Sequence, residues 1–364
     1  SLLLRTFNLK IECLARQIYD IIFILQNIFQ IFRSFVAYIS LNFMRYCSRP
    51  IAKAKYYLYL WKKCRAMAEA LCTSHQPQPA VMDDSIREYL LTEQFNAAVR
   101  AGAEIMKIYK QRDDYGVELK SDNSPITIAD RAAHDSIKLS LGATRIPILS
   151  EEGRQMLYEE RCNWDLFLLV DPLDGTKEFI KGNNEFTVNI ALLYNNECVA
   201  SVLYVPYHCK MYVAVKDYGA FLIRDIIPQE NPSYQSEQIS RLMEKLPLES
   251  AKHDGFRVAV SRSHQTPETH ERIEQMRELH PDLEVVEQGR SYKFCLLAEG
   301  CIDYYVRTTN TYEWDTAAGE LILTEAGGIA SDMQGNPLKL TETCSILASN
   351  KNCYDRLLEI CKNA

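Results

Sequence analysis

The sequence predicts an α/β protein with two lobes, an α+β lobe over residues 85–226 and an α/β lobe over residues 227–364. Three observations support this prediction. The 364 residues are 47% hydrophobic and 24% charged, with 14 Gly and 13 Pro, so the chain can bury a large core. In the first part of the chain the helix patterns come before the strand patterns, whereas in the second part strand and helix patterns alternate. A polar, irregular stretch, 227–255, separates the two parts.

The first lobe is predicted to hold two helices followed by five strands. Apolar residues recur at helical spacing over residues 95–109, and a second helix is expected over residues 127–141. The strands are short apolar runs with turn residues at their ends, and they cover residues 146–149, 166–170, 186–194, 198–204 and 211–215. Because Asn195-Asn196 favours a tight turn, we expect the third and fourth strands to form a hairpin.

The second lobe is predicted from strands that alternate with helices. Strand patterns cover residues 256–261, 283–287 and 302–306, and helix patterns cover residues 268–279, 291–299 and 316–326. Such alternation is typical of helices that pack on a sheet.

The first eighty residues differ from the rest in charge and hydropathy. Residues 1–75 hold 11 Lys and Arg against 3 Asp and Glu, a net charge of +8, which leaves 30 against 45, or −15, for the remainder. Two uncharged runs, 21–32 and 34–44, nearly suffice to cross a bilayer, but they contain Gln and Asn and have basic flanks. We therefore expect a cytoplasmic protein that contacts the inner membrane through residues 1–70, with a targeting segment, a spanning helix or an extension without a role as alternatives. The chain begins with Ser, so we expect its native start to lie upstream.

The charge and the cysteines argue against three classes of protein. An acidic main body disfavours nucleic-acid polymers as principal partners, since they are bound by basic surfaces. Small anionic ligands, held by a few cations or a metal ion, are compatible with it. The twelve cysteines show no C-x-x-C spacing, which favours reduced, buried thiols over a disulfide framework or a zinc site.

The segment 166–179, LFLLVDPLDGTKEF, is the most informative part of the chain. A buried strand is expected to end at Asp171, and a Pro-Leu turn then leads to Asp174. Both carboxylates and the Leu173 carbonyl can therefore face one point as hard oxygen ligands of Mg²⁺. Gly175 and Thr176 open a predicted helix, where exposed backbone N–H groups favour a phosphate. This turn can thus hold a metal ion and a phosphate together.

Two further carboxylates lie at the ends of predicted elements. Glu151 follows the strand at 146–149, and Asp315 precedes a helix of small residues. Three segments that each carry such a carboxylate can converge on a two-metal site. Taken singly, Asp174 and Asp315 also fit helix N-caps, and Glu151 fits a solvated turn. Phosphatases of the haloacid dehalogenase type have one residue between their two Asp, whereas two separate Asp171 from Asp174, which favours a water nucleophile.

Seven short sequence motifs lie within residues 88–361. They are KSDNSPITIAD at 120–130, SEE at 150–152, DPLDGTKEFI at 171–180, FTVNI at 186–190, SRSH at 261–264, KFCL at 293–296 and WDTAAG at 314–319. Their order and spacing resemble the lithium-sensitive, magnesium-dependent phosphatases related to inositol monophosphatase, and among these the 3′(2′),5′-bisphosphate nucleotidases of the CysQ type. The resemblance implies a five-layer αβαβα sandwich, two or three Mg²⁺ ions, and hydrolysis of the 3′-phosphate of adenosine 3′,5′-bisphosphate to give AMP, a step linked to sulfur assimilation.

The resemblance also implies which residues hold the metal. Glu151, Asp171 and the Leu173 carbonyl are expected to bind one Mg²⁺. Asp171, Asp174 and Asp315 are expected to bind the second.

Asp130 and Thr176 are implied to orient and deprotonate the attacking water. A Thr hydroxyl accepts a proton from water only if it donates its own, and Asp130 supplies the acceptor. The alternative for Asp130 is an N-terminal cap of its own helix.

The substrate-binding residues implied by the resemblance lie in both lobes. They are Glu151, Leu173, Asp174, Gly175, Thr176 and Asp315 at the reacting phosphate, and Ser263, His264, Lys293 and Arg307 at the rest of the nucleotide. We expect Lys293 and Arg307 to meet the 5′-phosphate or the adenine edge. Where the family often has Gly-Ser-Ser, this chain has Gly289-Arg290-Ser291, so Arg290 either strengthens or crowds the binding of the distal phosphate. The choice between the bisphosphate and its sulfated analogue therefore stays open.

Two other functions stay open at this point. Within the same enzyme class the alternative is an inositol monophosphatase or a related sugar phosphate phosphatase, although KEFI at 177–180 and SRSH at 261–264 favour the nucleotidase. From a different class, the chain could be a non-catalytic nucleotide-binding or membrane-tethered protein. The oligomeric state is not predicted.

Overall fold

The computed structural model describes residues 82–362, except residues 83, 112–114, 155, 157, 162–163, 263–265, 339–342 and 351–352. The described residues belong to one compact unit that begins at Met82. The expectations for residues 1–80 lie outside them. Among the described helices, none combines the length and the apolar character that a membrane span requires.

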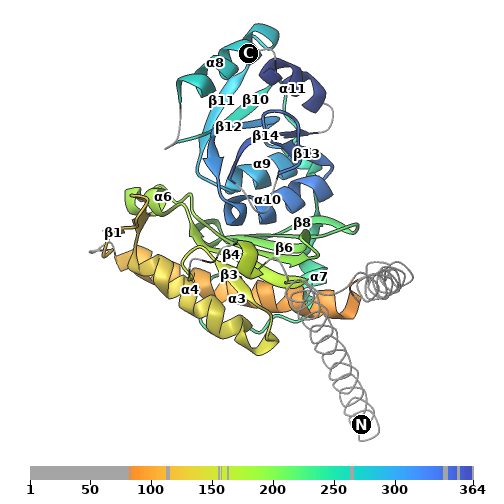
Figure 1. Ribbon diagram of the computed structural model, residues 1–364. Coiled ribbons are helices and arrows are strands. Elements are labelled where there is room, and N and C mark those ends of the chain that lie inside the picture. The colour runs from red at the N-terminus through yellow and green to blue at the C-terminus, as the bar shows by residue number, and fades with distance from the viewer. Residues whose placement is uncertain are drawn as a thin grey trace, which may run out of the picture. The chain divides into compact units, whose positions relative to one another are not determined.

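The unit has five layers in the order α, β, α, β, α (Figure 1). Helices α3 (Asp84–Gln111) and α4 (Ile128–Leu141) pack on a seven-stranded sheet, and α9 (Tyr292–Glu299) and α10 (Glu313–Glu325) lie between that sheet and a five-stranded one. Helices α8 (Pro267–Leu279) and α11 (Tyr354–Lys362) pack on the outer face of the second sheet. The α/β class and the five-layer sandwich expected from the sequence are confirmed.

The larger sheet is buried on both faces, and for this reason its central strands are continuous apolar runs. Val202 and Tyr204 face α3, while Leu203 and Val205 face the middle layer, because successive side chains of a strand alternate. The strand order is β3-β4-β5-β6-β7-β8-β9, with β3 parallel to β4 and all other pairs antiparallel. The strands are β3 (Ile148–Ser150), β4 (Leu166–Asp174), β5 (Thr187–Tyr194), β6 (Glu197–Val205), β7 (Lys210–Val215), β8 (Gly219–Ile223) and β9 (Glu244–Lys245).

The smaller sheet has the order β11-β10-β12-β14-β13, in which β10 is parallel to both β11 and β12, and β14 is antiparallel to both of its neighbours. The middle layer lies close to it. A Cβ at Gly319 of α10 would lie 2.6 Å from the Phe294 ring of α9, so this glycine allows the two helices to touch. Phe294 in turn packs on Tyr305 of β12, with 5.3 Å between ring centroids. The strands are β10 (Arg257–Ser261), β11 (Glu284–Gln288), β12 (Tyr304–Thr311), β13 (Gly328–Ser331) and β14 (Cys344–Asn350).

The structure adds elements that the sequence analysis does not predict. It has β8, β9 and, after residue 326, β13, β14 and α11. Since β9 pairs with β8, the larger sheet extends to Lys245, beyond the boundary expected after residue 226. The two-lobe division itself remains a proposal. The small elements are β1 (Glu118–Leu119), β2 (Pro125–Ile126), α5 (Tyr158–Arg161), α6 (Thr176–Lys181) and α7 (Ser236–Leu242).

The described cysteines are free thiols that lie buried or half-buried. Burial raises the pKa of Cys295 well above its usual range, as it does for others among them. A thiol held in its protonated form is a poor nucleophile. These residues therefore act as small apolar side chains.

Candidate active site

The end of β4 carries the first two predicted metal ligands. This strand was expected to end at Asp171. It continues instead to Asp174, and its register against β5 shifts between these two residues. Pro172 lies within this bulge, where the loss of a ladder hydrogen bond is tolerated. The Leu173 N–H donates to Oδ1 of Asp171 (3.1 Å). The bulge therefore fixes the Asp171 carboxylate.

Three carboxylates from separate elements meet at this end of β4. One oxygen each of Glu151, Asp171 and Asp315 lies within 4.8 Å of the other two. Glu151 follows β3, and its N–H donates to the Val170 carbonyl of β4 (3.0 Å). Asp315 lies in the first turn of α10. The structure thus brings together three of the residues that the sequence places at element ends.

The cluster has the properties of a cation site. Oδ2 of Asp171 is buried and has no hydrogen-bond partner among the described residues. Burial, and then the charge of Glu151, raises the pKa of Asp171 well above its usual range, and burial and Asp174 raise the pKa of Asp315 to about 7. Buried like charges are costly without a cation. Because carboxylate oxygens are the ligands that Mg²⁺ prefers, these residues fit a divalent ion.

Asp174 lies beside the cluster and is held by the loop that precedes α9. Its Oδ2 accepts hydrogen bonds from the Ser291 N–H (2.7 Å) and the Ser291 hydroxyl, and its Oδ1 is 3.6 Å from Nε of Arg290. Ser291 Oγ also lies 2.6 Å from the Asp315 carbonyl and accepts from the Asn189 amide (3.1 Å). Ser291 therefore ties Asp174 to Asp315. This role of Ser291 cannot be predicted from the sequence, because a serine before a helix carries no local sign of its distant partner.

Asp130 and Thr176, predicted as a pair, are hydrogen-bonded. The Thr176 hydroxyl donates to Oδ1 of Asp130 (2.9 Å). Oδ2 of Asp130 accepts from the N–H (2.8 Å) and hydroxyl (2.6 Å) of Thr127, which caps α4. The N-cap of α4 is Thr127, so the alternative that Asp130 is the cap is wrong; Asp130 lies in the first turn, where Oδ2 completes the capping box and Oδ1 pairs with Thr176. Burial raises the pKa of Asp130, although the hydrogen bonds from Thr127 and Thr176 oppose this.

Lys120, between β1 and β2, is a further charged group of the site. Its Nζ lies 2.7 Å from Oε1 of Glu151 and 2.5 Å from Oε1 of Glu152. Both carboxylates raise the pKa of Lys120, although burial opposes them. A permanent cation therefore balances part of the negative charge. Lys120 opens the motif at 120–130, but its sequence context predicts no role for it.

Comparison with known proteins identifies the family. Residues 87–364 match the inositol monophosphatase family. The chain belongs to this family. A 3′(2′),5′-bisphosphate nucleotidase CysQ of Shigella flexneri is 39% identical over 265 residues, which span 71% of this chain and 96% of that protein. The crystal structure of CysQ from Bacteroides thetaiotaomicron is 40% identical, with a TM-score of 0.65 over 72% of this chain and 98% of that one. SuhB from Bartonella henselae, 24% identical with a TM-score of 0.62 over 76% of this chain and 99% of that one, supports the fold alone.

Lys293, a predicted substrate ligand in this member of the inositol monophosphatase family, is fully buried. Its Nζ donates to the Gln288 carbonyl (3.2 Å) and lies 4.8 Å from the centre of the Tyr305 ring. Burial, and then the charge of Arg307, lowers the pKa of Lys293 to about 7. The structure therefore places Lys293 behind the site surface, and a direct contact with substrate stays a prediction.

The structure describes some of the other predicted substrate ligands but not all of them. Arg307 of β12 is 5% exposed, and its Nε donates to the Thr309 hydroxyl (3.1 Å). Gly175 has φ +105°, and a Cβ there would meet the backbone, so glycine is needed where the chain turns into α6. Ser263 and His264 lie outside the described residues.

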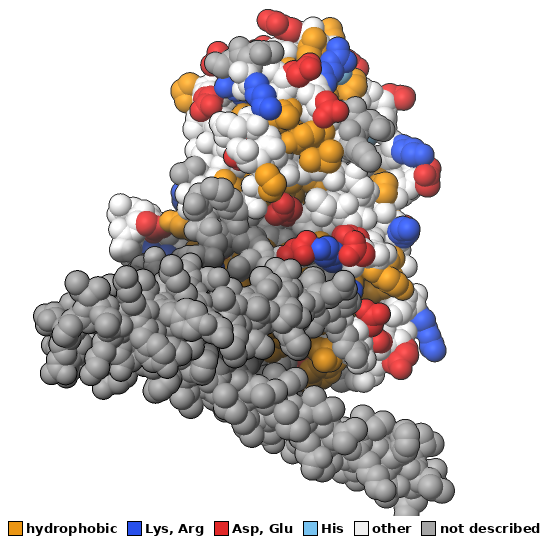
Figure 2. Space-filling model, turned by 45° about the vertical axis from the view of Figure 1, so that its right-hand side comes forward, with side chains coloured by type: hydrophobic (Ala, Val, Ile, Leu, Met, Phe, Trp, Pro, Cys, Tyr) orange, Lys and Arg blue, Asp and Glu red, His pale blue; other side chains and the backbone are white. Residues whose placement is uncertain are grey.

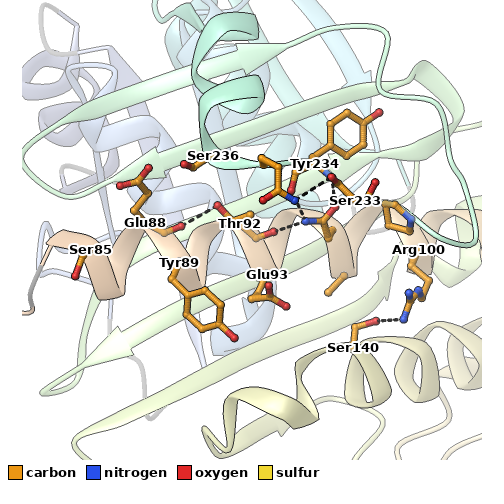
Figure 3. A pocket seen from close by; sticks show the side chains of 14 residues that line it. Ser85, Glu88, Tyr89, Thr92, Glu93, Arg100, Ser140, Ser233, Tyr234 and Ser236 are labelled. Atoms are coloured by element: carbon orange, nitrogen blue, oxygen red, sulfur yellow. Dashed lines mark hydrogen bonds between the residues drawn. The ribbon is translucent and has the colours of Figure 1, made fainter. Parts of the chain in front are cut away.

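A pocket of about 490 Å³ away from this cluster is less suited to a phosphate ester. It lies between α3, the end of α4 and residues 232–236 (Figure 3). Glu88 and Glu93 contribute negative charge to its lining. Arg100, on its rim, is engaged with the Glu230 carbonyl (2.9 Å) and the Ser140 hydroxyl (3.0 Å). We therefore place the chemistry of this family at the carboxylate cluster.

Mg²⁺ is expected to stabilise the protein more at about pH 8 than at about pH 6. The native pKa of Asp315, about 7, lies above the unfolded value of about 4. The metal-free fold therefore loses stability as the pH rises from about 4 to about 7, because folding opposes the ionisation of Asp315. Below about pH 7 a metal ion must also displace the proton of Asp315. Thermal unfolding with and without MgCl₂ at both pH values measures this. An equal or larger rise in Tm at pH 6 would contradict it, and Asp315→Asn should weaken the pH dependence.

Ser291→Ala is expected to destabilise the metal-free protein by about 1–3 kcal/mol. The substitution leaves the buried Asp174 carboxylate with one partner fewer. Ser136→Ala is the matched control, because the buried Ser136 hydroxyl has no hydrogen-bond partner among the described residues. Urea unfolding of both variants measures the difference. Equal midpoints would show that Ser291 does not hold Asp174.

Proposed function

We propose that the protein is a Mg²⁺-dependent 3′(2′),5′-bisphosphate nucleotidase that converts adenosine 3′,5′-bisphosphate to AMP and phosphate, a reaction linked to sulfur assimilation. The observation that carries the proposal is the meeting of Glu151, Asp171 and Asp315. The name of the Shigella flexneri relative, which is 39% identical, supports the nucleotide as substrate. The sulfated analogue is a second candidate substrate.

The metal ligands that we propose extend the observed cluster. Glu151, Asp171 and the Leu173 carbonyl would hold one Mg²⁺, and Asp171, Asp174 and Asp315 would hold another, with a third ion as a further candidate. The bound ions would supply positive charge against the phosphate oxygens and the leaving 3′ oxygen. The unpartnered Oδ2 of Asp171 supports this assignment.

Asp130 and Thr176 provide a path for the proton of the attacking water. Because the Thr176 hydroxyl donates to Asp130, its lone pairs can accept a proton from water. The proton of Thr176 then passes to Oδ1 of Asp130. Burial supports this transfer, since it raises the pKa of Asp130 and so stabilises the protonated carboxyl. The chain needs no covalent intermediate.

Positive charge next to the cluster supports a substrate with a second phosphate. Arg307 is close enough to lower the pKa of Asp315, and Lys293 lies near Arg307. We propose that Arg307 supplies most of the positive charge that attracts the distal end of the nucleotide, and that Lys293, Ser263 and His264 also bind this end. Gly175 and Thr176 would face the reacting phosphate.

A small nucleotide suits the surface better than a nucleic-acid polymer. Among the coloured side chains in Figure 2, Lys and Arg are interspersed with Asp and Glu rather than gathered into one basic area. A polymer would require such an area.

The substrate proposal is tested by comparing kcat/KM for adenosine 3′,5′-bisphosphate, inositol 1-phosphate and fructose 1,6-bisphosphate in the presence of MgCl₂. We expect the nucleotide to be preferred over inositol 1-phosphate by at least about tenfold, because a charge-assisted contact to a second phosphate, which the inositol ester lacks, is worth at least the 1.4 kcal/mol that this ratio represents. A preference for inositol 1-phosphate would favour the inositol monophosphatase alternative. Nucleotide binding without turnover of any ester would favour the non-catalytic one.

We also propose that the protein acts in the cytoplasm and contacts the inner membrane through residues 1–70. The support is the net charge of +8 over residues 1–75 and the two uncharged runs. Separation of membranes from cytosol, for the full chain and for a chain that begins at Met82, tests this. Equal distribution of the two would contradict the membrane contact.

A further inference from the structure

Arg290, in the loop before α9, places its guanidinium next to Asp174 and Glu178, beside the carboxylate cluster. Its backbone φ of +39° falls in the left-handed region, which arginine rarely adopts. Two hydrogen bonds hold this conformation, one from the Gly289 N–H to Oε2 of Glu185 (2.8 Å) and one from the Ser291 N–H to Oδ2 of Asp174 (2.7 Å). A Cβ at Gly289 would lie 2.7 Å from the Glu185 carbonyl, so the loop is packed tightly. The backbone thus fixes the direction of the Arg290 side chain.

The guanidinium of Arg290 lies among acids without a close hydrogen bond at Nε. The side chain is 19% exposed, and Nε is 3.6 Å from Oδ1 of Asp174 and 3.7 Å from Oε2 of Glu178. These separations suit an ion pair but exceed a normal hydrogen bond. Nε is buried and has no hydrogen-bond partner among the described residues. The group is therefore attracted by charge but not locked in place.

We propose that Arg290 is the resident counter-cation of Asp174. Its positive charge weakens the binding of a divalent ion at Asp174, relative to the binding of an ion by Glu151 and Asp171. The inference rests on the proposed metal-dependent function and deepens it. Both cations are attracted to the same carboxylate, and they repel each other at short range. An ion that binds at Asp174 must either displace the guanidinium or bind against its charge. Occupancy of the two metal positions is then stepwise.

The geometry argues for a role at Asp174 rather than for a general effect on the cluster. The oxygen of Asp174 that faces Arg290 is Oδ1, whereas Ser291 holds Oδ2. Lys120 pairs instead with Glu151 and Glu152. Glu151 and Asp174 thus have different counter-cations, and of these two cations it is Arg290 whose backbone lies in the left-handed region.

Calorimetric titration of the full chain with MgCl₂, without substrate and at about pH 8, tests the inference. We expect Arg290→Gln to tighten the weaker Mg²⁺-binding event by at least about tenfold, because one positive charge beside that ion is removed. Arg290→Lys, which keeps the charge, should stay near the wild-type affinity. Arg277→Gln is the matched control, since Arg277 is a half-exposed arginine of α8 paired with Glu274.

Thermal unfolding gives a second readout that does not depend on activity. In EDTA, Arg290→Gln should lower Tm relative to wild type, because Asp174 loses its counter-cation, while saturating MgCl₂ should bring the two proteins close together. Mg²⁺ affinities within twofold of each other, with equal Tm values in EDTA, would overturn the inference and leave the proposed nucleotidase intact. Absence of Mg²⁺ binding in every variant would overturn both.

Discussion

Asp171→Asn should abolish Mg²⁺-dependent phosphate release, by at least about a thousandfold, and should stabilise the metal-free protein. Asp171 lies at the centre of the cluster and is proposed to contact both ions. Its pKa is raised well above the unfolded value, so its charge opposes folding at every pH above about 4. An Asn amide carries no charge and can donate to Glu151. Activity and folding stability should therefore change in opposite directions.

Phosphate release with MgCl₂ and urea unfolding in EDTA, both at about pH 8, measure the two effects. Asp135→Asn removes the same charge from an exposed position of α4 and should change neither quantity appreciably. If Asp171→Asn destabilised the metal-free protein and retained activity, Asp171 would be a structural residue and not a ligand.

Thr176→Val should lower kcat by about 10²–10⁴ and leave the Mg²⁺ affinity near that of the wild type. The substitution keeps the shape of the side chain but removes the hydroxyl that bonds Asp130. The metal ligands do not include this hydroxyl, so the loss should fall on the proton transfer alone. Thr176→Ser keeps the hydroxyl and is the matched control, which should retain most of the activity.

Calorimetry with MgCl₂ and steady-state kinetics separate these effects. A loss of Mg²⁺ affinity equal to the loss of kcat would show that Thr176 supports the metal site instead. Equal activities of the Val and Ser variants would contradict a role for the hydroxyl.

The parts of the site that are encoded locally could be predicted from the sequence. Asp171 and Asp174 share one turn, and Glu151 and Asp315 each lie beside an element boundary. Carboxylates at such positions converge once the strands pair. The pairing of Asp130 with Thr176 followed only from the family resemblance, because the two are 46 residues apart.

The parts that depend on distant contacts could not be predicted. Ser291 is 117 residues from Asp174, and its sequence context is that of an ordinary residue before a helix. The contact of Lys293 with substrate, implied by the family resemblance, stays a prediction, but the full burial of Lys293 was not expected, because burial depends on the packing of the apolar helix around it. Pro172 suggested the end of a strand, whereas the ladder accommodates it in a bulge.

Identification of the products tests the central claim most directly. The purified full chain is incubated with adenosine 3′,5′-bisphosphate and MgCl₂ in ¹⁸O-labelled water, and the products are analysed by phosphorus NMR and mass spectrometry. We predict 5′-AMP without label and inorganic phosphate that carries one ¹⁸O, since water attacks the 3′-phosphorus. Adenosine 3′-monophosphate as the product, or label in the nucleotide, would contradict the account.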